Sequence, residues 1–167
     1  MTVAIKKYSD DLKQRFLDEK ERLKTLLPDS IKIEHVGSSA VKIGGKNIVD
    51  ILIGVSDEAE MKNVRDILAK NGYHEGNDTH EDRVFLASRE GETGEGDIHI
   101  HLCLASSDTY QNFIALRDSL INNPVRAKEY FDKKHEFAKA ADYDRKKYKA
   151  LKSKYVSELL LEAKNCK

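Results

Sequence analysis

The chain has 167 residues, of which 40% are hydrophobic and 35% are charged, and its formal net charge is zero. This length supports one domain with a substantial core, so we expect a single domain over residues 1–167. The zero net charge argues against bulk nucleic-acid binding. No apolar run has the length of a membrane span, no apolar signal region opens the chain, and two cysteines do not build a disulfide framework. We therefore expect a cytoplasmic protein with no membrane partner.

Charge is distributed unevenly along the chain. Residues 75–108 hold nine acids and two bases, net −7, whereas residues 123–167 hold thirteen bases and seven acids, net +6. An acidic middle beside a basic tail could form a cleft for a cation and phosphate groups. The two regions could equally be solvated faces that attract each other, and the sequence leaves both interpretations open.

The first third of the chain predicts a helix followed by two strands. Ser9 or Asp10 can cap this helix, which carries one apolar stripe and is ended by Pro28. A strand over 31–36 is followed by a connection over 37–47. The next strand, over 48–55, is nearly all apolar, which is typical of a strand that is covered on both faces.

The remaining elements alternate less regularly. Ser56 is expected to cap a helix that Gly72 ends. Strands over 82–88 and 97–104 flank a glycine-rich segment, which favours a hairpin and therefore antiparallel pairing.

Three helices are expected to complete the chain. The first covers 109–121, the second begins at Pro124 after the cap Asn123, and the third covers 142–163. The third carries an apolar stripe of Tyr148, Leu151, Tyr155 and Leu159. The order of elements predicts an α+β fold with a small mixed sheet, flanking helices and a helical C-terminal half.

The strongest functional signal is the segment Ile-Glu-His-Val-Gly-Ser-Ser-Ala at 33–40. Gly37 and Ser38 fall at an expected tight turn, and Asp50 follows near the start of the next strand. A glycine lets the backbone approach a bulky anion, and serine adds N–H and hydroxyl donors. A nearby carboxylate can ligate a hard cation that neutralises phosphate oxygens. The pattern predicts a nucleotide site or, more simply, a turn followed by a solvated aspartate.

This segment resembles the GrpB family. The family pattern is matched from 33 to 41 and again at Lys46, Asp50 and Ile51. The chain departs from the pattern at Lys42 and Asn47, where proline is usual. Looser matches are Arg83 with Phe85, the strand over 97–102, and Tyr148 with Lys152.

The resemblance implies the fold of the nucleotidyltransferase superfamily. Those enzymes use a Gly-Ser turn, then D-x-[DE] on a strand and a third acid on a later strand, to hold two metal ions. Gly37, Ser38 and Asp50 match this arrangement, but Leu52 stands at the position of the second acid and cannot ligate a metal. A divalent metal, Mg²⁺ or Mn²⁺, is the implied cofactor, on a weakened site unless other ligands substitute.

The strand Asp-Ile-His-Ile-His that begins at Asp97 offers such ligands. Alternation places Asp97, His99 and His101 on one face. Two imidazoles two residues apart in a strand can chelate one metal, and imidazole favours Zn, Mn, Fe or Ni over Mg. The histidines could instead hydrogen-bond to neighbours on a half-exposed face. Asp97 or either histidine could represent the third acid, and the sequence does not decide between them.

Four further side chains could contact phosphate: Ser39, Lys46, Arg83 and Lys152. Lys46 is also compatible with an ordinary surface role. The planar guanidinium of Arg83 could clamp a phosphate or pair with a nearby acid. Lys152 lies one helical turn after Tyr148 and is a candidate for contact with a triphosphate.

The leading interpretation is a nucleotidyltransferase-fold protein that binds a nucleoside triphosphate together with a divalent metal. If it is active, it transfers a nucleotidyl group to an acceptor that the sequence does not identify. The alternative is a catalytically silent module that binds a nucleotide or a phosphorylated metabolite. Leu52 favours the alternative, whereas the His-x-His strand and the Gly-Ser turn with Asp50 favour the first. No pattern indicates the nucleotide base or the oligomeric state.

Overall fold

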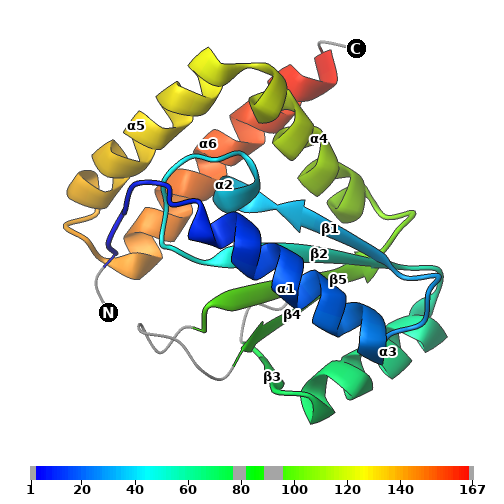
Figure 1. Ribbon diagram of the computed structural model, residues 1–167. Helices are drawn as coiled ribbons and strands as arrows, with labels where there is room; N and C mark the ends of the chain where they lie inside the picture. The colour runs from blue at the N-terminus through cyan, green and yellow to red at the C-terminus, as the bar shows by residue number, and fades with distance from the viewer. Residues whose placement is uncertain (1–2, 77–81, 89–95, 166–167) are drawn as a thin grey trace.

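The computed structural model of the chain describes residues 3–76, 82–88 and 96–165 (Figure 1). Its elements are α1 (Asp11–Leu26), β1 (Lys32–Val36), α2 (Gly37–Ala40), β2 (Val49–Val55), α3 (Glu58–Lys70), β3 (Tyr73–Glu75), β4 (Arg83–Ser88), β5 (Ile98–Leu104), α4 (Asp108–Asn122), α5 (Pro124–Ala140) and α6 (Arg145–Asn165). The predicted α+β fold with a helical C-terminal half is confirmed.

The strands form one mixed sheet of five, in the order β1-β2-β5-β4-β3. β2 and β5 run parallel, and the other neighbouring pairs are antiparallel. The predicted antiparallel pairing of β4 with β5 is thus confirmed, although residues 89–95 of the segment between them lie outside the described residues. The sequence did not predict β3, because three residues are too few to show alternation.

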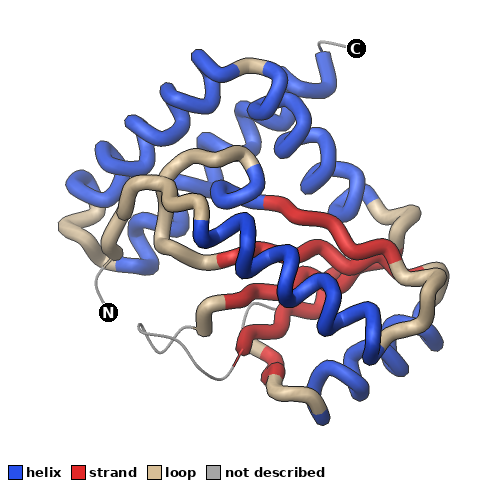
Figure 2. The backbone as a smooth tube through the Cα atoms, in the orientation of Figure 1, coloured by secondary structure: helices blue, strands red, loops and turns tan. Residues whose placement is uncertain are grey.

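Helices cover both faces of the sheet (Figures 1 and 2). Ile33, Ile51 and Ile100 pack in one core with side chains of α1 and α3. Leu52 and Cys103 point to the opposite face and pack beneath Tyr110 of α4. β2 is therefore covered on both sides, as its continuous apolar sequence predicts. In Figure 1, α5 and α6 lie beyond the end of the sheet at which α2 sits.

Two predicted helix starts need correction. The N-cap of α3 is Asp57, whose side chain accepts from the Glu60 N–H, whereas Ser56 bonds to the Glu60 carboxylate. α6 begins at Arg145 rather than at 142, because Asp142 and Tyr143 have φ of 51° and 56°, in the left-handed region that a right-handed helix excludes.

Other helix predictions differ less from the structure. The Asn123 cap and Pro124 start of α5 are confirmed, since the Asn123 side chain accepts from the Arg126 N–H. On α6, Tyr148 and Leu159 are buried as predicted, but Leu151 is exposed.

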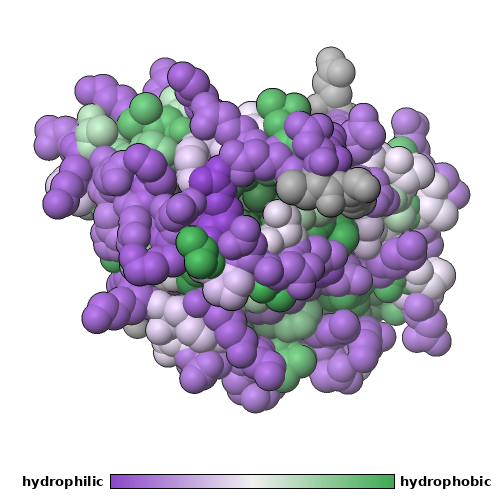
Figure 3. All heavy atoms as spheres, turned by 90° about the horizontal axis from the view of Figure 1, so that it is seen from above, coloured by the Kyte–Doolittle hydropathy of each residue, from purple (hydrophilic) through white to green (hydrophobic). Residues whose placement is uncertain are grey.

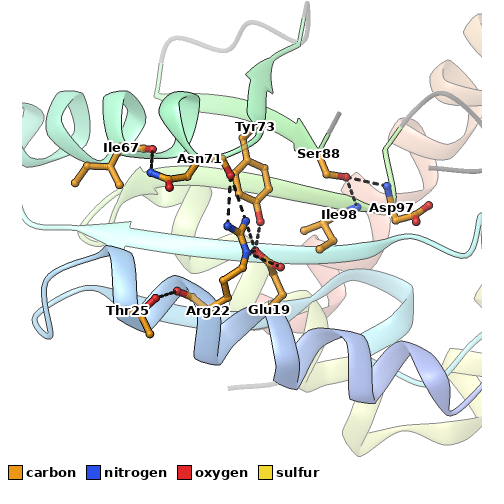
Figure 4. Close-up of polar contacts among 9 residues, drawn as sticks. All are labelled: Glu19, Arg22, Thr25, Ile67, Asn71, Tyr73, Ser88, Asp97 and Ile98. Atoms are coloured by element: carbon orange, nitrogen blue, oxygen red, sulfur yellow. Dashed lines mark hydrogen bonds and ion pairs between the residues drawn. The ribbon is translucent and has the colours of Figure 1, made fainter. Parts of the chain in front are cut away.

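Polar contacts tie the outer elements to the sheet (Figure 4). Glu19 of α1 accepts from the Tyr73 hydroxyl of β3 and pairs with Arg22 at 2.8 Å. At the start of β5, Ser88 Oγ accepts from the N–H groups of Asp97 and Ile98 at 3.0 and 3.2 Å. These contacts fix where β5 enters the sheet.

One face of the molecule is largely polar. Figure 3 shows one face that is mostly hydrophilic, with hydrophobic residues in small groups. In the part of the chain that the structure describes, no helix combines the length and apolar character needed to cross a membrane.

Candidate functional site

The predicted Gly-Ser turn is the start of the single-turn helix α2. Gly37 has φ of +72°, which reverses the chain directly after β1. The β1–β2 register places Val36 opposite Asp50. A Cβ at Gly37 would lie 2.5 Å from Asp50 Oδ2. Both the backbone conformation and the closeness of the Asp50 carboxylate therefore require glycine here.

Asp50 meets two histidines of the neighbouring parallel strand. Asp50 is in register with His99, and Leu52 is in register with His101. Asp50 Oδ1 lies 3.3 Å from His101 Nε2 and 3.7 Å from His99 Nδ1. The structure thus brings together three of the four residues expected to hold a metal.

The charge state of this cluster follows from its burial and its hydrogen bond. Burial alone would raise the pKa of Asp50, but the hydrogen bond from His101 and the nearby positive groups lower that pKa to about 2. Burial lowers the pKa of His101. The consistent arrangement is an ionised Asp50 that accepts from the Nε2–H of a neutral His101. Nδ1 of His101 is buried and has no hydrogen-bond partner among the described residues.

Asp97 does not join this cluster. Its carboxylate lies 3.8 Å from Arg15 Nη2 of α1, and its carbonyl also accepts from Arg15. Asp97 precedes β5, so the alternation of that strand does not govern its side chain. Within the described ranges, no group of three or more His, Cys, Asp or Glu side chains is placed to hold a metal ion.

The place of a second acid is filled by hydrophobic packing. Leu52 is fully buried beneath Tyr110 of α4, in a cluster that includes Val36 and Cys103. The pair of metal ions that the superfamily uses does not fit this environment, since β2 offers no second carboxylate beside Asp50. The donor chemistry of Asp50 with His99 fits one divalent ion at most.

A cavity of about 130 Å³ opens beside Asp50. We call it the Ser38 cavity. Its wall is formed by Leu12, Ser38, Ser39, Ile43, Gly45, Lys46, Asn47, Ile48, Asp50, His99, Lys134, Tyr148 and Lys152. Six predicted site residues are in this wall: Ser38, Ser39, Lys46, Asp50, His99 and Lys152. Gly37 and His101 are next to Asp50 but are not in the wall.

Arg83 lies apart from the Ser38 cavity. It is on β4, opposite Cys103, and its guanidinium carbon is 5.9 Å from the centre of the Phe113 ring. That distance is typical of a cation–π contact with α4. The predicted phosphate-clamping position of Arg83 is therefore not part of this cavity.

Lys134 is the site residue that the sequence analysis missed. It lies on α5, is only 1% exposed, and donates from Nζ to Ser38 Oγ and, at 2.8 Å, to the Gly44 carbonyl. Burial lowers the pKa of Lys134 to about 7, with a further contribution from Lys152 that outweighs the opposing effect of Asp50. One signal was present: Ala127, Tyr130, Lys134 and Ala138 form the buried stripe of α5, which places a lysine on an apolar face.

His35 of β1 contacts both α1 and α2. Its Nε2 lies 2.9 Å from Ser39 Oγ, and its ring stacks on Phe16 of α1 with centroids 4.2 Å apart. Burial lowers the pKa of His35 to about 4, so the ring is neutral at pH 7. His35 thus connects α1 to α2 and fixes the orientation of the turn that carries Ser38.

The connection from α2 to β2 takes an unusual path. Lys42 and Asn47 have φ of 61° and 65°. Proline is fixed near φ of −65° and cannot adopt these values. Both positions at which the chain departs from the family pattern therefore have a backbone conformation that excludes proline.

Comparisons with known proteins agree on the family. The sequence profile described as GrpB protein matches residues 2–162. The glutamate-rich protein GrpB of Alkalihalophilus pseudofirmus is 31% identical, over 96% of this chain and 95% of its own length. A UPF0157 protein of Vibrio cholerae is 30% identical, over 83% of this chain and 70% of its own length.

Solved structures agree on the fold. The crystal structure of the conserved protein GrpB from Enterococcus faecalis aligns with a TM-score of 0.80 and 25% identity over 96% of both chains. A mutant of the Cid1 poly(U) polymerase bound to MgATP aligns with a TM-score of 0.54 and 15% identity, over 84% of this chain and 46% of the polymerase. The chain therefore has a nucleotidyltransferase-like fold and spans less than half of that enzyme.

Proposed function

This chain belongs to the GrpB family, and we propose that it binds the phosphate groups of a nucleoside triphosphate in the Ser38 cavity. One observation carries the proposal. Two lysines from different helices, Lys134 and Lys152, converge with Ser38 on a cavity beside one ionised carboxylate, Asp50. Ammonium and hydroxyl donors that converge from separate elements suit an anionic ligand with several oxygens.

The backbone around the cavity supports the same ligand class. Gly37 lets the Asp50 carboxylate lie close to the start of α2, and Gly45 lies in the cavity wall beside Ser38. Among solved structures of this fold, the Cid1 mutant named above is described as bound to MgATP. By analogy we assign the triphosphate, rather than the base, to the wall formed by Ser38, Lys46 and Lys152.

A divalent metal, Mg²⁺ or Mn²⁺, would bind at Asp50 with His99 as a second donor. When bound, it would offset phosphate charge and polarise a phosphoryl oxygen. Since one carboxylate and an imidazole make a mixed donor set, Mn²⁺ should bind better than Mg²⁺. His101 holds the Asp50 carboxylate in place through its Nε2–H.

A second candidate function is nucleotidyl transfer to a hydroxyl or amine acceptor. The cluster of Asp50 with His99 and His101 favours it, because an ionised acid beside the cavity is what such chemistry needs. Leu52 weighs against it, so we place binding first and transfer second. The cytoplasm stays our prediction for where either function operates.

Calorimetric titration tests the binding proposal. ATP titrated into the protein with Mn²⁺ should give saturable binding, weaker with Mg²⁺ and weakest without metal. Ser38→Ala and Lys152→Ala should each weaken binding by about tenfold or more, because each removes a hydrogen bond to a charged group. Asp50→Asn should remove the dependence on metal.

The matched control for Lys152→Ala is Lys154→Ala, which removes an exposed lysine two residues further along α6. This variant should bind ATP like the wild-type protein. If the wild type binds ATP no better than the Ser38→Ala and Lys152→Ala variants do, the nucleotide does not occupy this cavity.

A further inference from the structure

The wall of the Ser38 cavity holds the buried Lys134 amine, which has no carboxylate in direct contact among the described residues. Lys134 Nζ is held by Ser38 Oγ and by the Gly44 carbonyl, both of which are uncharged acceptors. Its ammonium also lies 4.6 Å from the centre of the Tyr130 ring. A buried charge is costly unless an opposite charge compensates it. The neutral amine is therefore the less costly form of Lys134 while the cavity holds no anion.

Charged and titratable groups surround Lys134 on several elements: β2, β5, α6 and the α2–β2 connection. Lys152 of α6 is positive and opposes the ammonium, and Asp50 of β2 is negative and supports it. The Asp50 carboxylate accepts a hydrogen bond from His101 of β5 and is not in direct contact with the Lys134 amine. His99 of β5, Lys46 of the α2–β2 connection and Tyr148 of α6 share the same cavity wall. Among the described residues of the cavity wall, Asp50 is the one carboxylate, whereas three lysines, Lys46, Lys134 and Lys152, lie in the same wall.

We propose that a phosphate-bearing ligand binds in the Ser38 cavity together with one proton, which Lys134 takes up from solvent. This inference rests on the proposed function and adds a coupling that phosphate binding alone does not imply. The ligand brings the missing negative charge, and the lone pair of Lys134 Nζ accepts the proton. Protonation then adds an N–H donor for the bound phosphate.

The coupling has a defined pH window. In the ligand-free protein Lys134 loses its proton near pH 7, as burial lowers its pKa to about 7. A bound anion raises that pKa, so uptake should be small at pH 6 and approach one proton per site at pH 8. Over the same range affinity should fall by up to about tenfold per pH unit as pH rises.

The ligand's own titration runs in the opposite direction. A terminal phosphate has a second pKa of about 6, so any proton that it gains or loses matters most at low pH. Uptake that grows from pH 6 to pH 8 is therefore a signature of the lysine and not of the phosphate.

Calorimetry in buffers of different ionisation enthalpy measures this uptake. Inorganic triphosphate and ATP should each be titrated at pH 6, 7 and 8 in two buffers with low and high enthalpies. The wild-type protein should take up close to zero protons at pH 6 and close to one at pH 8. Lys134→Arg keeps a permanent cation, so any binding that it retains should show no such rise.

The possible outcomes are distinct. Binding with proton uptake that stays flat or falls from pH 6 to pH 8 overturns the coupling and leaves the proposed function standing. An equal rise in Lys134→Arg also overturns it, because another group would then be the acceptor. Absence of binding at all three pH values removes the proposed function and the coupling together. If Lys134→Arg does not fold, the pH profile of the wild type still decides.

Discussion

Gly37 connects the conformation of one residue to the position of one carboxylate. Its φ of +72° and the 2.5 Å gap between a built Cβ and Asp50 Oδ2 are separate constraints on the same position. Gly72 has a similar left-handed φ of +98° but nothing within 4 Å of a built Cβ. The two glycines are thus a matched pair. Gly72 is required by its positive φ alone, whereas Gly37 is required by its positive φ and by its contact with Asp50.

We expect Gly37→Ala to destabilise the fold more than Gly72→Ala does. Left-handed backbone should cost each alanine about 1–2 kcal/mol, and only Gly37→Ala also displaces the Asp50 carboxylate. Urea denaturation of both variants measures the difference. Equal losses would mean that Asp50 moves aside at no cost and that its position is not fixed by the turn.

Lys134 should make the stability of the protein depend on pH. Its pKa is about 7 in the folded protein against an ordinary 10.5. Between these values the unfolded chain binds more protons, so the free energy of unfolding should rise with pH, by up to about 1.4 kcal/mol per pH unit. Below pH 7 the lysine is charged in both states, and the penalty for burying it is present in full.

Lys134→Met isolates this effect. The stability of the variant relative to wild type should be most favourable at pH 6 and should decline steadily towards pH 9.5, as measured by urea denaturation. Lys128→Met is the control, because Lys128 lies on the same helix with a side chain that is 76% exposed. A difference between Lys134→Met and wild type that does not change with pH would show that Lys134 does not titrate in this range.

The residues of the candidate site were predictable where a regular element carries them. Asp50 and His99 meet because β2 and β5 are parallel neighbours, and their types and spacing in the sequence indicated a common site. Asp97 departs from the expectation because it lies one residue before β5 and pairs with Arg15. Lys134 was missed because its partner Ser38 is 96 residues away, and no local pattern reports such a contact.

At the scale of elements, the α2–β2 connection decides how the cavity wall is built. Lys42 and Asn47 both adopt left-handed backbone, and Lys46 of the wall lies between them. Asparagine tolerates this conformation better than lysine does, and glycine tolerates it without cost. The connection therefore keeps Lys42 in a backbone conformation that lysine disfavours.

Substitutions at Asn47 and Lys42 test the backbone path of this connection. Asn47→Pro should destabilise the protein and weaken ATP binding, since proline cannot reach φ of 65°. Lys42→Gly should leave the fold intact and raise its stability by up to about 1 kcal/mol through relief of strain. Thermal unfolding measures both effects. An Asn47→Pro variant that is as stable as wild type would mean that the connection can follow a second path.

The elements themselves were largely predictable. The stripe of α1, the continuous apolar run of β2 and the Asn123-Pro124 start of α5 each carry a physical signal within one element. β3 and the start of α6 were not predictable in this way. β3 forms because it pairs with β4. α6 begins only after Asp142 and Tyr143, because both residues have left-handed backbone. Both features depend on tertiary contacts rather than on periodicity.

At the scale of the whole molecule, the sheet serves two different purposes on one face. Near the start of β2 that face carries Asp50, His99 and His101. Two residues further along β2, at Leu52, α4 packs on the same face. Leu52 marks the boundary between the polar and the packed part. The fold is nucleotidyltransferase-like, and hydrophobic packing fills position 52 on the sheet face that carries Asp50.

Leu52→Asp tests whether position 52 can hold a carboxylate. Leu52 is fully buried against Val36, Cys103 and Tyr110, so a carboxylate here would be buried without a partner. We expect this variant to lose far more stability than Leu52→Ala, whose own cost should be roughly 2–5 kcal/mol. Urea denaturation of the two variants gives the comparison.

The same variant separates the two candidate functions. Wild type and Leu52→Asp should be incubated with α-labelled ATP, Mn²⁺ or Mg²⁺, and a panel of alcohols, amines and proteins. Because the side chain at position 52 packs beneath Tyr110 of α4, we expect no labelled adduct and no pyrophosphate from Leu52→Asp beyond the wild-type level. A folded Leu52→Asp variant that forms adduct faster than wild type, and loses this activity with Asp50→Asn, would show that the two-metal geometry persists. Transfer would then replace binding as the first function of this cavity.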